Sequence, residues 1–206
     1  MGRIRKLKKQ GKMSGWAAFA AVFLTAAVII ALGFVLWHSG LPARLYYPLE
    51  YKDEIIAACD EYSLDPCLVA AVIHTESRFK PDAVSVDGAV GLMQVLPSTA
   101  EWIAQMRGME YDEAKLTDSA YNIDLGCWLL KYLSDRYEGN TRYALIAYNA
   151  GHGRLESWLA SDEYTDENGD LAVIPYGETD NYVKRIDNSI TQYRKLYGEG
   201  LENANY

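Results

Sequence analysis

The chain has 206 residues and a formal net charge of −8 at pH 7. Its length favours one domain with a full hydrophobic core plus an appendage, and is short for two domains. Residues 1–12 carry six basic residues and no acidic one, so residues 38–206 hold 14 basic and 28 acidic residues, a net charge of −14. This balance excludes nucleic acid and anionic lipid as the main partners of residues 38–206, because both need clustered Lys and Arg.

The first predicted element is an apolar helix that spans a membrane. Residues 14–37 contain no charged residue and carry a Trp near each end, at Trp16 and Trp37. A helix of this length, at about 1.5 Å per residue, crosses a hydrocarbon layer of about 30 Å. The basic segment 1–13 should stay on the cytoplasmic side, which predicts an N-in, C-out topology with residues 38–49 as a linker.

A cleaved signal peptide is the alternative for this helix, since it also has a basic start and an apolar middle. Its apolar region usually has about 7 to 15 residues and precedes small residues at a cleavage site. The longer apolar run and the sequence WHSGLPARLYY that follows it favour an uncleaved anchor. The core helix of a soluble protein fits less well, because nothing on this helix is polar enough to meet water.

The rest of the chain is predicted to be mostly helical over residues 50–198, with a tail at 199–206. Three predicted helices cover residues 51–62, 97–107 and 153–160. Four others are predicted from their caps: one starts at Pro66 with Asp65 as N-cap, one runs from the cap Asp118 to Gly139, one is capped by Thr141, and the last runs from the cap Thr179 to Gly198. Residues 80–95 contain Pro81, Gly88 and Gly91, which predicts a loop with a small β-ribbon that forms a wall of the site. Residues 161–177 are predicted to form an acidic loop.

The cysteine and histidine content argues against a protein-built metal site. Cys59 and Cys127 lie on predicted apolar helix faces, which favours small core residues, while a bridge between Cys59 and Cys67 stays open. The chain has three His and neither a C-x-x-C nor an H-E-x-x-H motif, so we expect no metal. His74 is expected to be a partly exposed helix residue.

The stretch AAVIHTESRF places a carboxylate, Glu76, in a row of apolar residues. Val69, Val72 and Ile73 precede it at the spacing of one buried helix face. Burial and the carbonyl groups of the last helical turn should both raise the pKa of Glu76 and keep a fraction of it protonated near neutral pH. A general acid needs this property. The alternative is a surface Glu at a helix end, or one paired with Lys80.

The residues around Glu76 resemble the catalytic domain of the lytic transglycosylases. The sequence HTESRFKPDAVSVDGAVGLMQVLPSTA is similar to the family pattern E-S-x-F-x-P-x-A-x-S, then G-A-x-G-L-M-Q, then P-x-T-A. The blocks NIDLGCWLLKYL, ALIAYNAGHGRLESW and IPYGETDNYVKRI follow in the family's order, so the resemblance covers residues 50–197 and is specific. Leu96 stands where many relatives have Met, and residues 161–173 read as an acidic insertion.

The resemblance implies a lysozyme-like, mostly helical fold that cuts the glycan strands of peptidoglycan without a cofactor. It implies that Glu76 protonates the leaving oxygen between N-acetylmuramic acid and N-acetylglucosamine. Glu76 would then deprotonate the C6 hydroxyl of the same sugar, which gives a 1,6-anhydromuramyl end. Most glycosidases pair two carboxylates, whereas here the acetamido group and the C6 hydroxyl of the substrate would replace the second one.

Substrate-binding roles follow from the same resemblance. They fall to Ser85, Gly91, Leu92, Met93, Gln94, Tyr148, Asn149, Glu178 and Tyr182. Ser85 would orient Glu76 or the acetamido group, and residues 91–94 would form a wall along the sugar with Gln94 as a hydrogen-bonding side chain. The plain alternatives are turn chemistry for Ser85 and core packing for Met93.

The later blocks supply the other implied ligands of the sugar. Tyr148 and Asn149 would reach the sugar at the cleavage point, and Tyr182 would offer a ring for stacking. Glu178 precedes a predicted helix start, where a negative charge is stabilised, so we expect it to stay ionised and to bind or organise rather than donate a proton. Helix packing and capping are the plain alternatives for Tyr148, Asn149 and Tyr182.

Two other functions remain open at this point. A goose-type lysozyme would hydrolyse the same bond, and a non-catalytic wall-binding protein of an envelope assembly would keep the fold without the reaction. The intact Glu76, Ser85, Gln94 and Glu178 favour an enzyme.

Overall fold

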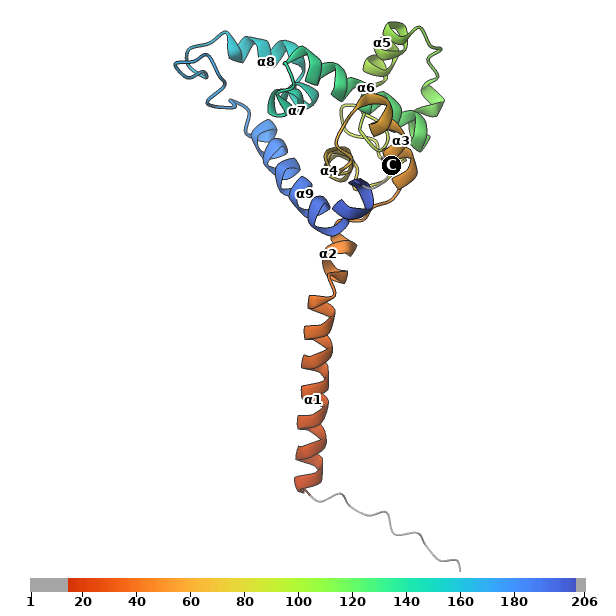
Figure 1. Ribbon diagram of the computed structural model, residues 1–206, viewed down its shortest axis with the longest axis vertical. Helices are drawn as coiled ribbons and strands as arrows, with labels where there is room; N and C mark the ends of the chain where they lie inside the picture. The colour runs from red at the N-terminus through yellow and green to blue at the C-terminus, as the bar shows by residue number, and fades with distance from the viewer. Residues whose placement is uncertain (1–14, 203–206) are drawn as a thin grey trace, which may run out of the picture. The chain divides into compact units, whose positions relative to one another are not determined.

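The computed structural model describes residues 15–202, drawn as coloured ribbon in Figure 1. The predicted basic segment 1–13 and residues 203–206 of the predicted tail lie outside the described residues. The chain divides into two compact units, Met1–Leu45 and Tyr46–Tyr206. The predicted linker therefore reaches into the second unit, where Tyr47 and Leu49 pack against the core.

The first unit consists mainly of α1 (Gly15–His38), which has 24 residues and no buried side chain. By length and composition alone, this helix can cross a membrane, in agreement with the predicted span. Its one hydroxyl side chain near the middle, Thr25, donates to the carbonyl of Ala21 at 2.7 Å, so the polar group is satisfied within the helix. The short helix α2 (Leu41–Tyr46) follows, within the segment predicted as a linker.

The second unit, called the outer unit below, is built from helices. These are α3 (Lys52–Tyr62), α4 (Pro66–Glu76), α5 (Pro97–Arg107), the 3₁₀-helix η1 (Glu113–Thr117), α6 (Ser119–Arg136), α7 (Thr141–Ala150), α8 (His152–Leu159) and α9 (Gly177–Glu202). Isolated β-bridges join Val84 to Val90 and Val90 to Val95, where a small ribbon was predicted. The mostly α fold class is confirmed.

Helix α4 lies at the centre of the outer unit and packs along α9 (Figure 1). Eight of its eleven residues are buried, including Val72 and Ile73 at 0 % exposure. Burying a side chain of this size stabilises a fold by about 1.5–3 kcal/mol. The helix starts as predicted, because the carboxylate of Asp65 accepts from the backbone N–H of Cys67 at 2.8 Å and Pro66 occupies the first turn.

The predicted end of α6 and the predicted start of α7 are wrong. Asn140, and not Thr141, caps α7, because its side-chain oxygen accepts from the N–H of Tyr143 at 3.1 Å. Helix α6 ends at Arg136, before Gly139, and Gly139 then takes a left-handed φ of 82°.

The ends of the last helix also differ from the prediction. Helix α9 already begins at Gly177, so Thr179 lies inside its first turn and does not cap it. The helix continues to Glu202, past the predicted end at Gly198, and so takes in part of the predicted tail.

The packing of the outer unit decides two predictions, one about the cysteines and one about His74. Cys59, Cys67 and Cys127 are all buried and free, so the open Cys59–Cys67 bridge is not formed. Burial raises the pKa of Cys59 to about 12, which keeps the thiol protonated. His74 is buried rather than partly exposed, and its Nε2 donates to the carbonyl of Tyr46 at 2.9 Å.

Candidate active site

Glu76 is the last residue of α4, and its carboxyl group lies between α4 and α9. The hydroxyl of Tyr182, in the second turn of α9, donates to Oε1 of Glu76 at 2.7 Å. Burial raises the pKa of Glu76 to about 7, and the Tyr182 hydrogen bond and the positive charge of Arg185 oppose this shift without cancelling it. The predicted rise in the pKa of Glu76 is confirmed, with burial as its main cause.

Two tyrosines from different helices approach this carboxyl group. Burial, followed by the charge of Glu76, raises the pKa of both Tyr148 on α7 and Tyr182 on α9 well above the ordinary value. Both hydroxyls therefore stay protonated and act as hydrogen-bond donors. The ring of Tyr182 is only 2 % exposed, so the expected stacking of this ring on a sugar is wrong.

The loop after α4 is held in place by one buried amide on α6. Asn122 is 0 % exposed; its Oδ1 accepts from the N–H of Met93 at 2.7 Å, and its Nδ2 donates to the carbonyls of Val90 and Leu116 at 2.9 and 2.8 Å. Gly91 has a φ of 84°, and a Cβ there would lie 2.3 Å from Nδ2 of Asn122. The glycine is required by both its conformation and this close approach.

The predicted sugar wall is only partly available to a ligand. The side chains of Leu92 and Met93 are both 0 % exposed, and Met93 occupies the space that a Cβ at Gly126 would need. The side chain of Gln94 is partly exposed, and its Nε2 donates to the carbonyls of Ala83 and Gly91 at 3.0 and 2.9 Å. Leu92 and Met93 therefore build the loop and leave no exposed atom for a ligand.

One backbone atom of this loop connects it to the tyrosines. The hydroxyl of Tyr148 donates to the carbonyl of Met93 at 2.8 Å, which fixes the ring between the loop and Glu76. The contact joins residues 55 positions apart in the chain. Tyr148 is thus the residue that brings the loop and the end of α4 into one site.

The remaining predicted residues lie around this centre in different settings. Ser85 is exposed, and its hydroxyl accepts from the N–H of Ala89 at 3.0 Å, which is turn chemistry. Asn149 accepts from the hydroxyl of Thr179 at 2.9 Å, a bond that ties the end of α7 to the start of α9. Glu178 is exposed in the first turn of α9.

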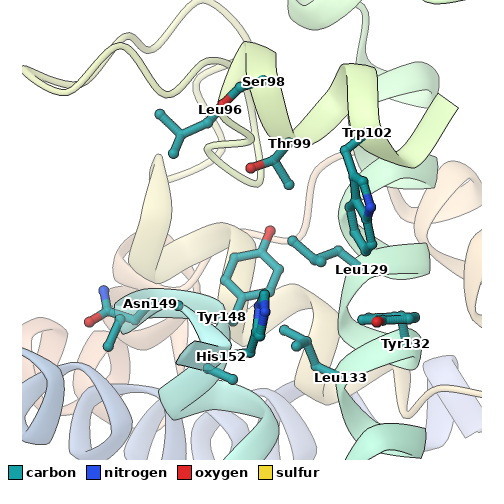
Figure 2. Close-up of a pocket in the computed structure, with 13 residues that line it drawn as sticks. Leu96, Ser98, Thr99, Trp102, Leu129, Tyr132, Leu133, Tyr148, Asn149 and His152 are labelled. Carbon is teal, nitrogen blue, oxygen red and sulfur yellow. The ribbon is translucent and has the colours of Figure 1, made fainter. Parts of the chain in front are cut away.

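A cavity of about 450 Å³ opens beside Tyr148. Its lining, drawn in Figure 2, consists of Leu96, Ser98, Thr99, Trp102, Leu129, Tyr132, Leu133, Ala147, Tyr148, Asn149, Ala150, Gly151 and His152. Figure 2 shows Tyr148 at the centre, with Asn149 on one side and Trp102 and Tyr132 on the other. The rings of Trp102 and Tyr132 meet edge to face, with 5.1 Å between their centroids.

Sequence analysis did not find this aromatic wall. Trp102 lies on α5 and Tyr132 on α6, and nothing in the order of the residues pairs these two faces. The sequence feature that could have indicated this wall is a set of three large aromatic residues on two amphipathic helices, namely Trp102, Trp128 and Tyr132. All three are partly exposed in the structure. Within residues 15–202, no group of three or more His, Cys, Asp or Glu could hold a metal ion.

A comparison with known protein families matches the part of the chain that forms most of this site. Residues 53–170 match the family described as Transglycosylase SLT domain. The chain belongs to this family. The match runs from the start of α3 to the acidic loop before α9, and so includes Glu76, the loop at 83–95 and Tyr148.

Two relatives illustrate the range of the family. The soluble lytic murein transglycosylase of Salmonella typhimurium is 31% identical over 156 residues, which are 74% of this chain and 24% of the relative. Membrane-bound lytic murein transglycosylase C of Actinobacillus pleuropneumoniae is 33% identical over 186 residues, 80% of this chain and 50% of the relative. This SLT-domain chain therefore spans a quarter to a half of these relatives.

Solved structures agree with the fold. The 70 kDa soluble lytic transglycosylase of Escherichia coli superimposes with a TM-score of 0.67 at 31% identity, over 74% of this chain and 25% of that one. An inactive Glu-to-Gln mutant of the lytic transglycosylase Slt from Pseudomonas aeruginosa gives a TM-score of 0.65 at 29% identity, over 73% of this chain and 25% of that one. The lysozyme-like fold class of the outer unit is thereby confirmed.

Proposed function

We propose that this chain is a membrane-anchored lytic transglycosylase that cleaves the β-1,4 bond between N-acetylmuramic acid and N-acetylglucosamine in peptidoglycan. The observation that carries the proposal is the largely buried carboxyl group of Glu76, with a pKa raised to about 7 and a hydrogen bond from Tyr182. The names of the relatives support the choice of murein as substrate.

The pKa of Glu76 suits a group that acts twice. Near pH 7 the protonated and ionised forms are both well populated, so the same carboxyl group can donate a proton and later accept one. Protonated Glu76 gives its proton to the glycosidic oxygen as that bond breaks. Ionised Glu76 then takes the proton of the C6 hydroxyl as its oxygen bonds to the anomeric carbon, which forms the 1,6-anhydro ring and restores the acid.

Burial and Tyr182 act in opposite directions on the charge of this carboxyl group. Tyr182 stabilises the ionised form by its hydrogen bond, so it opposes the burial that favours the neutral acid. In the described part of the chain, no second carboxylate contributes to the pKa shift of Glu76. One carboxyl group acting with the substrate's own hydroxyl fits this arrangement better than the usual pair.

The cavity beside Tyr148 is proposed to hold the glycan next to the cleaved bond. Its volume of about 450 Å³ and its partly exposed rings, Trp102 and Tyr132, suit the flat apolar face of a sugar. Asn149 lies at its edge and offers a polar group, while Ser85, Gln94 and Glu178 are proposed to bind or orient the sugar from the surface of the site.

Membrane anchoring by α1 is part of the proposal. The helix is 24 residues long and contains an 18-residue stretch with a mean hydropathy of 2.7, and a membrane-bound relative aligns with 80% of the chain. The basic residues before it favour an N-in topology, with the outer unit as the catalytic domain outside the cytoplasmic membrane. We keep residues 14–37 as the proposed anchor, with a shorter linker after it and a catalytic part that begins at Tyr46 and extends at least to Glu202.

Mass spectrometry of digested peptidoglycan tests the reaction. The purified full-length chain in neutral detergent is expected to release muropeptides that lack the mass of one water, since the C6 hydroxyl closes the ring. Products with only reducing ends would identify a hydrolase of the lysozyme type and contradict the proposal. Binding to peptidoglycan without any cleavage would identify a non-catalytic wall-binding protein.

A further inference from the structure

A second, smaller pocket lies on the side of α4 that faces the start of the outer unit. It has a volume of about 140 Å³ and is lined by Tyr46, Tyr47, His74, Thr75, Arg78, Arg185, Asn188 and Ser189. Its walls come from the last turn of α4 and the middle of α9, the same two helices that carry Glu76 and Tyr182. The pocket therefore lies close to the catalytic carboxyl group, but shares no lining residue with the cavity beside Tyr148.

The charge of this pocket is opposite to that of the unit around it. Residues 38–206 carry a net charge of −14, yet the lining includes two arginines and no carboxylate. Among residues 15–202, the ion pairs use other Lys and Arg residues, and none of them involves Arg78 or Arg185. Two guanidinium groups outside these ion pairs, in a strongly acidic unit, give this pocket a positive charge that suits an anion, although Arg185 also acts on the charge of Glu76.

The neutral groups of the pocket fit the same ligand. Burial lowers the pKa of His74, the hydrogen bond to the carbonyl of Tyr46 opposes this shift, and the charge of Arg78 adds to it, so the neutral imidazole is favoured and the positive charge of the pocket comes from the arginines. Thr75, Asn188 and Ser189 add hydroxyl and amide donors that can complete the shell of an oxyanion. The volume admits a carboxylate but not a sugar ring, since ligand pockets for larger groups usually exceed about 300 Å³.

We infer that Arg78 and Arg185 bind a free carboxylate of the peptide stem that peptidoglycan carries on its N-acetylmuramic acid. The inference rests on the proposed function, because the stem is attached to the sugar whose bond would be cleaved. The acidic outer unit repels an anionic polymer, and the pocket next to Glu76 gives the anionic part of that polymer one attractive contact. Arginine binds carboxylates through two parallel hydrogen bonds, which gives both affinity and orientation.

Arg78 and Asn188 are the positions for the test, because Arg185 also acts on the charge of Glu76. Full-length enzyme is compared on two substrates: glycan strands with intact stems, and the same strands after an amidase has removed the stems. The readout is kcat/KM for the strands with stems divided by kcat/KM for the strands without stems. We expect Arg78→Ala to lower this ratio about tenfold, mainly through a higher KM for the strands with stems.

Asn188→Asp should lower the ratio at least as far, because it places a carboxylate in the pocket without removing an arginine. Lys195→Ala is the matched control, since it removes one exposed positive charge from α9 outside the pocket. This control should keep the wild-type ratio within about twofold. Amidation of the stem carboxylates should lower the ratio for the wild type and leave the Arg78→Ala ratio unchanged.

The outcomes separate this inference from the proposed function. An unchanged ratio in Arg78→Ala and Asn188→Asp overturns the stem site, and so does an equal loss on both substrates, which would indicate a structural role. If the two substitutions change only how the chain distributes between neutral and anionic lipid vesicles, the pocket binds lipid. This result would also overturn the stem site. If the wild type cleaves neither substrate, the proposed function itself has failed.

Discussion

Two apolar helices, α1 and α4, have opposite surroundings. Helix α1 has 24 residues and none of them is buried, whereas α4 has 11 residues and eight of them are buried. Both sequences are rich in Ala, Val and Ile, so an apolar composition by itself does not say which of them is buried. The two helices differ in their length and in the acid at the end of α4. Helix α1 is long enough to cross a lipid layer, while α4 is a core helix that carries Glu76 into a site.

The largest expected effect concerns the polar end of α4. Glu76→Gln keeps the shape of the side chain but cannot exchange a proton, so the rate of glycan cleavage should fall by about 10² to 10⁴-fold. The assay counts anhydro ends released per minute by the full-length chain. Glu178→Gln is the comparison, because Glu178 is exposed, and a loss as large as that of Glu76→Gln would move the acid to Glu178.

The buried face of α4 should be the next most sensitive. Ile73→Ala leaves a cavity at a fully buried position and should lower the free energy of unfolding of the outer unit by about 2–5 kcal/mol. The same change in α1, Ile29→Ala, should leave that free energy unchanged, because no residue of α1 is buried. Denaturant unfolding followed by tryptophan fluorescence compares the two, and equal losses would remove the distinction between the helices.

A charge in α1 tests its proposed role as an anchor. Ile29→Asp places a carboxylate near the middle of the helix, where a membrane would resist it by about 2.5–3.5 kcal/mol. The fraction of the chain that sediments with membranes should fall, while the glycan-cleaving activity of detergent-solubilised enzyme stays at the wild-type level. Unchanged sedimentation would show that α1 does not hold the chain in the membrane.

The raised pKa of Glu76 predicts a pH-dependent cost in stability. Its pKa rises from 4.5 when unfolded to about 7 when folded, so stability is fully present below pH 4.5 and is lost as the pH rises through 7. Glu76→Gln removes this loss and should stabilise the outer unit by on the order of 2 kcal/mol at pH 8. Unfolding at pH 4.5 is the control, where the two proteins should differ little; a constant difference across this range would contradict the shift.

The smallest expected effect concerns the partner of Glu76 on α9. Tyr182→Phe removes the hydrogen bond that lowers the pKa of Glu76, so that pKa should rise further. The pH profile of kcat/KM should move to higher pH, with a loss of less than about tenfold at its maximum. Tyr197→Phe, which removes a hydroxyl that donates to the carbonyl of Tyr47, is a matched control and should leave the profile in place.

The helices that were predicted well carry their signals locally. Asp65 and Pro66 start α4, and Pro97 starts α5, because caps and first-turn prolines act within a few residues. One error arose where two neighbouring residues could both cap a helix, and another where a cap-forming side chain has a distant partner. Asn140 and Thr141 are adjacent cap candidates, and Thr179 has a cap-forming side chain that instead donates to Asn149 across 30 residues.

The site shows the same division between local and distant causes. The row of apolar residues before Glu76 was sufficient to predict its burial and the direction of its pKa shift. Sequence order could not show that Asn122 holds the loop 29 residues before it, or that Met93 fills the space beside Gly126. Leu92 and Met93 therefore read as ligand contacts although they are core residues.

By itself, the sequence determined a long apolar helix, a mostly helical outer unit and the position of the acid, because periodicity and composition act along the chain. Only the tertiary structure decided what surrounds that acid, since Tyr148, Tyr182 and Arg185 reach it from helices more than 60 residues away. The same packing of α4 on α9 brings Arg78 and Arg185 to one pocket. Burial and charge at a point in space depend on which helices meet there, and this depends on how their side chains pack.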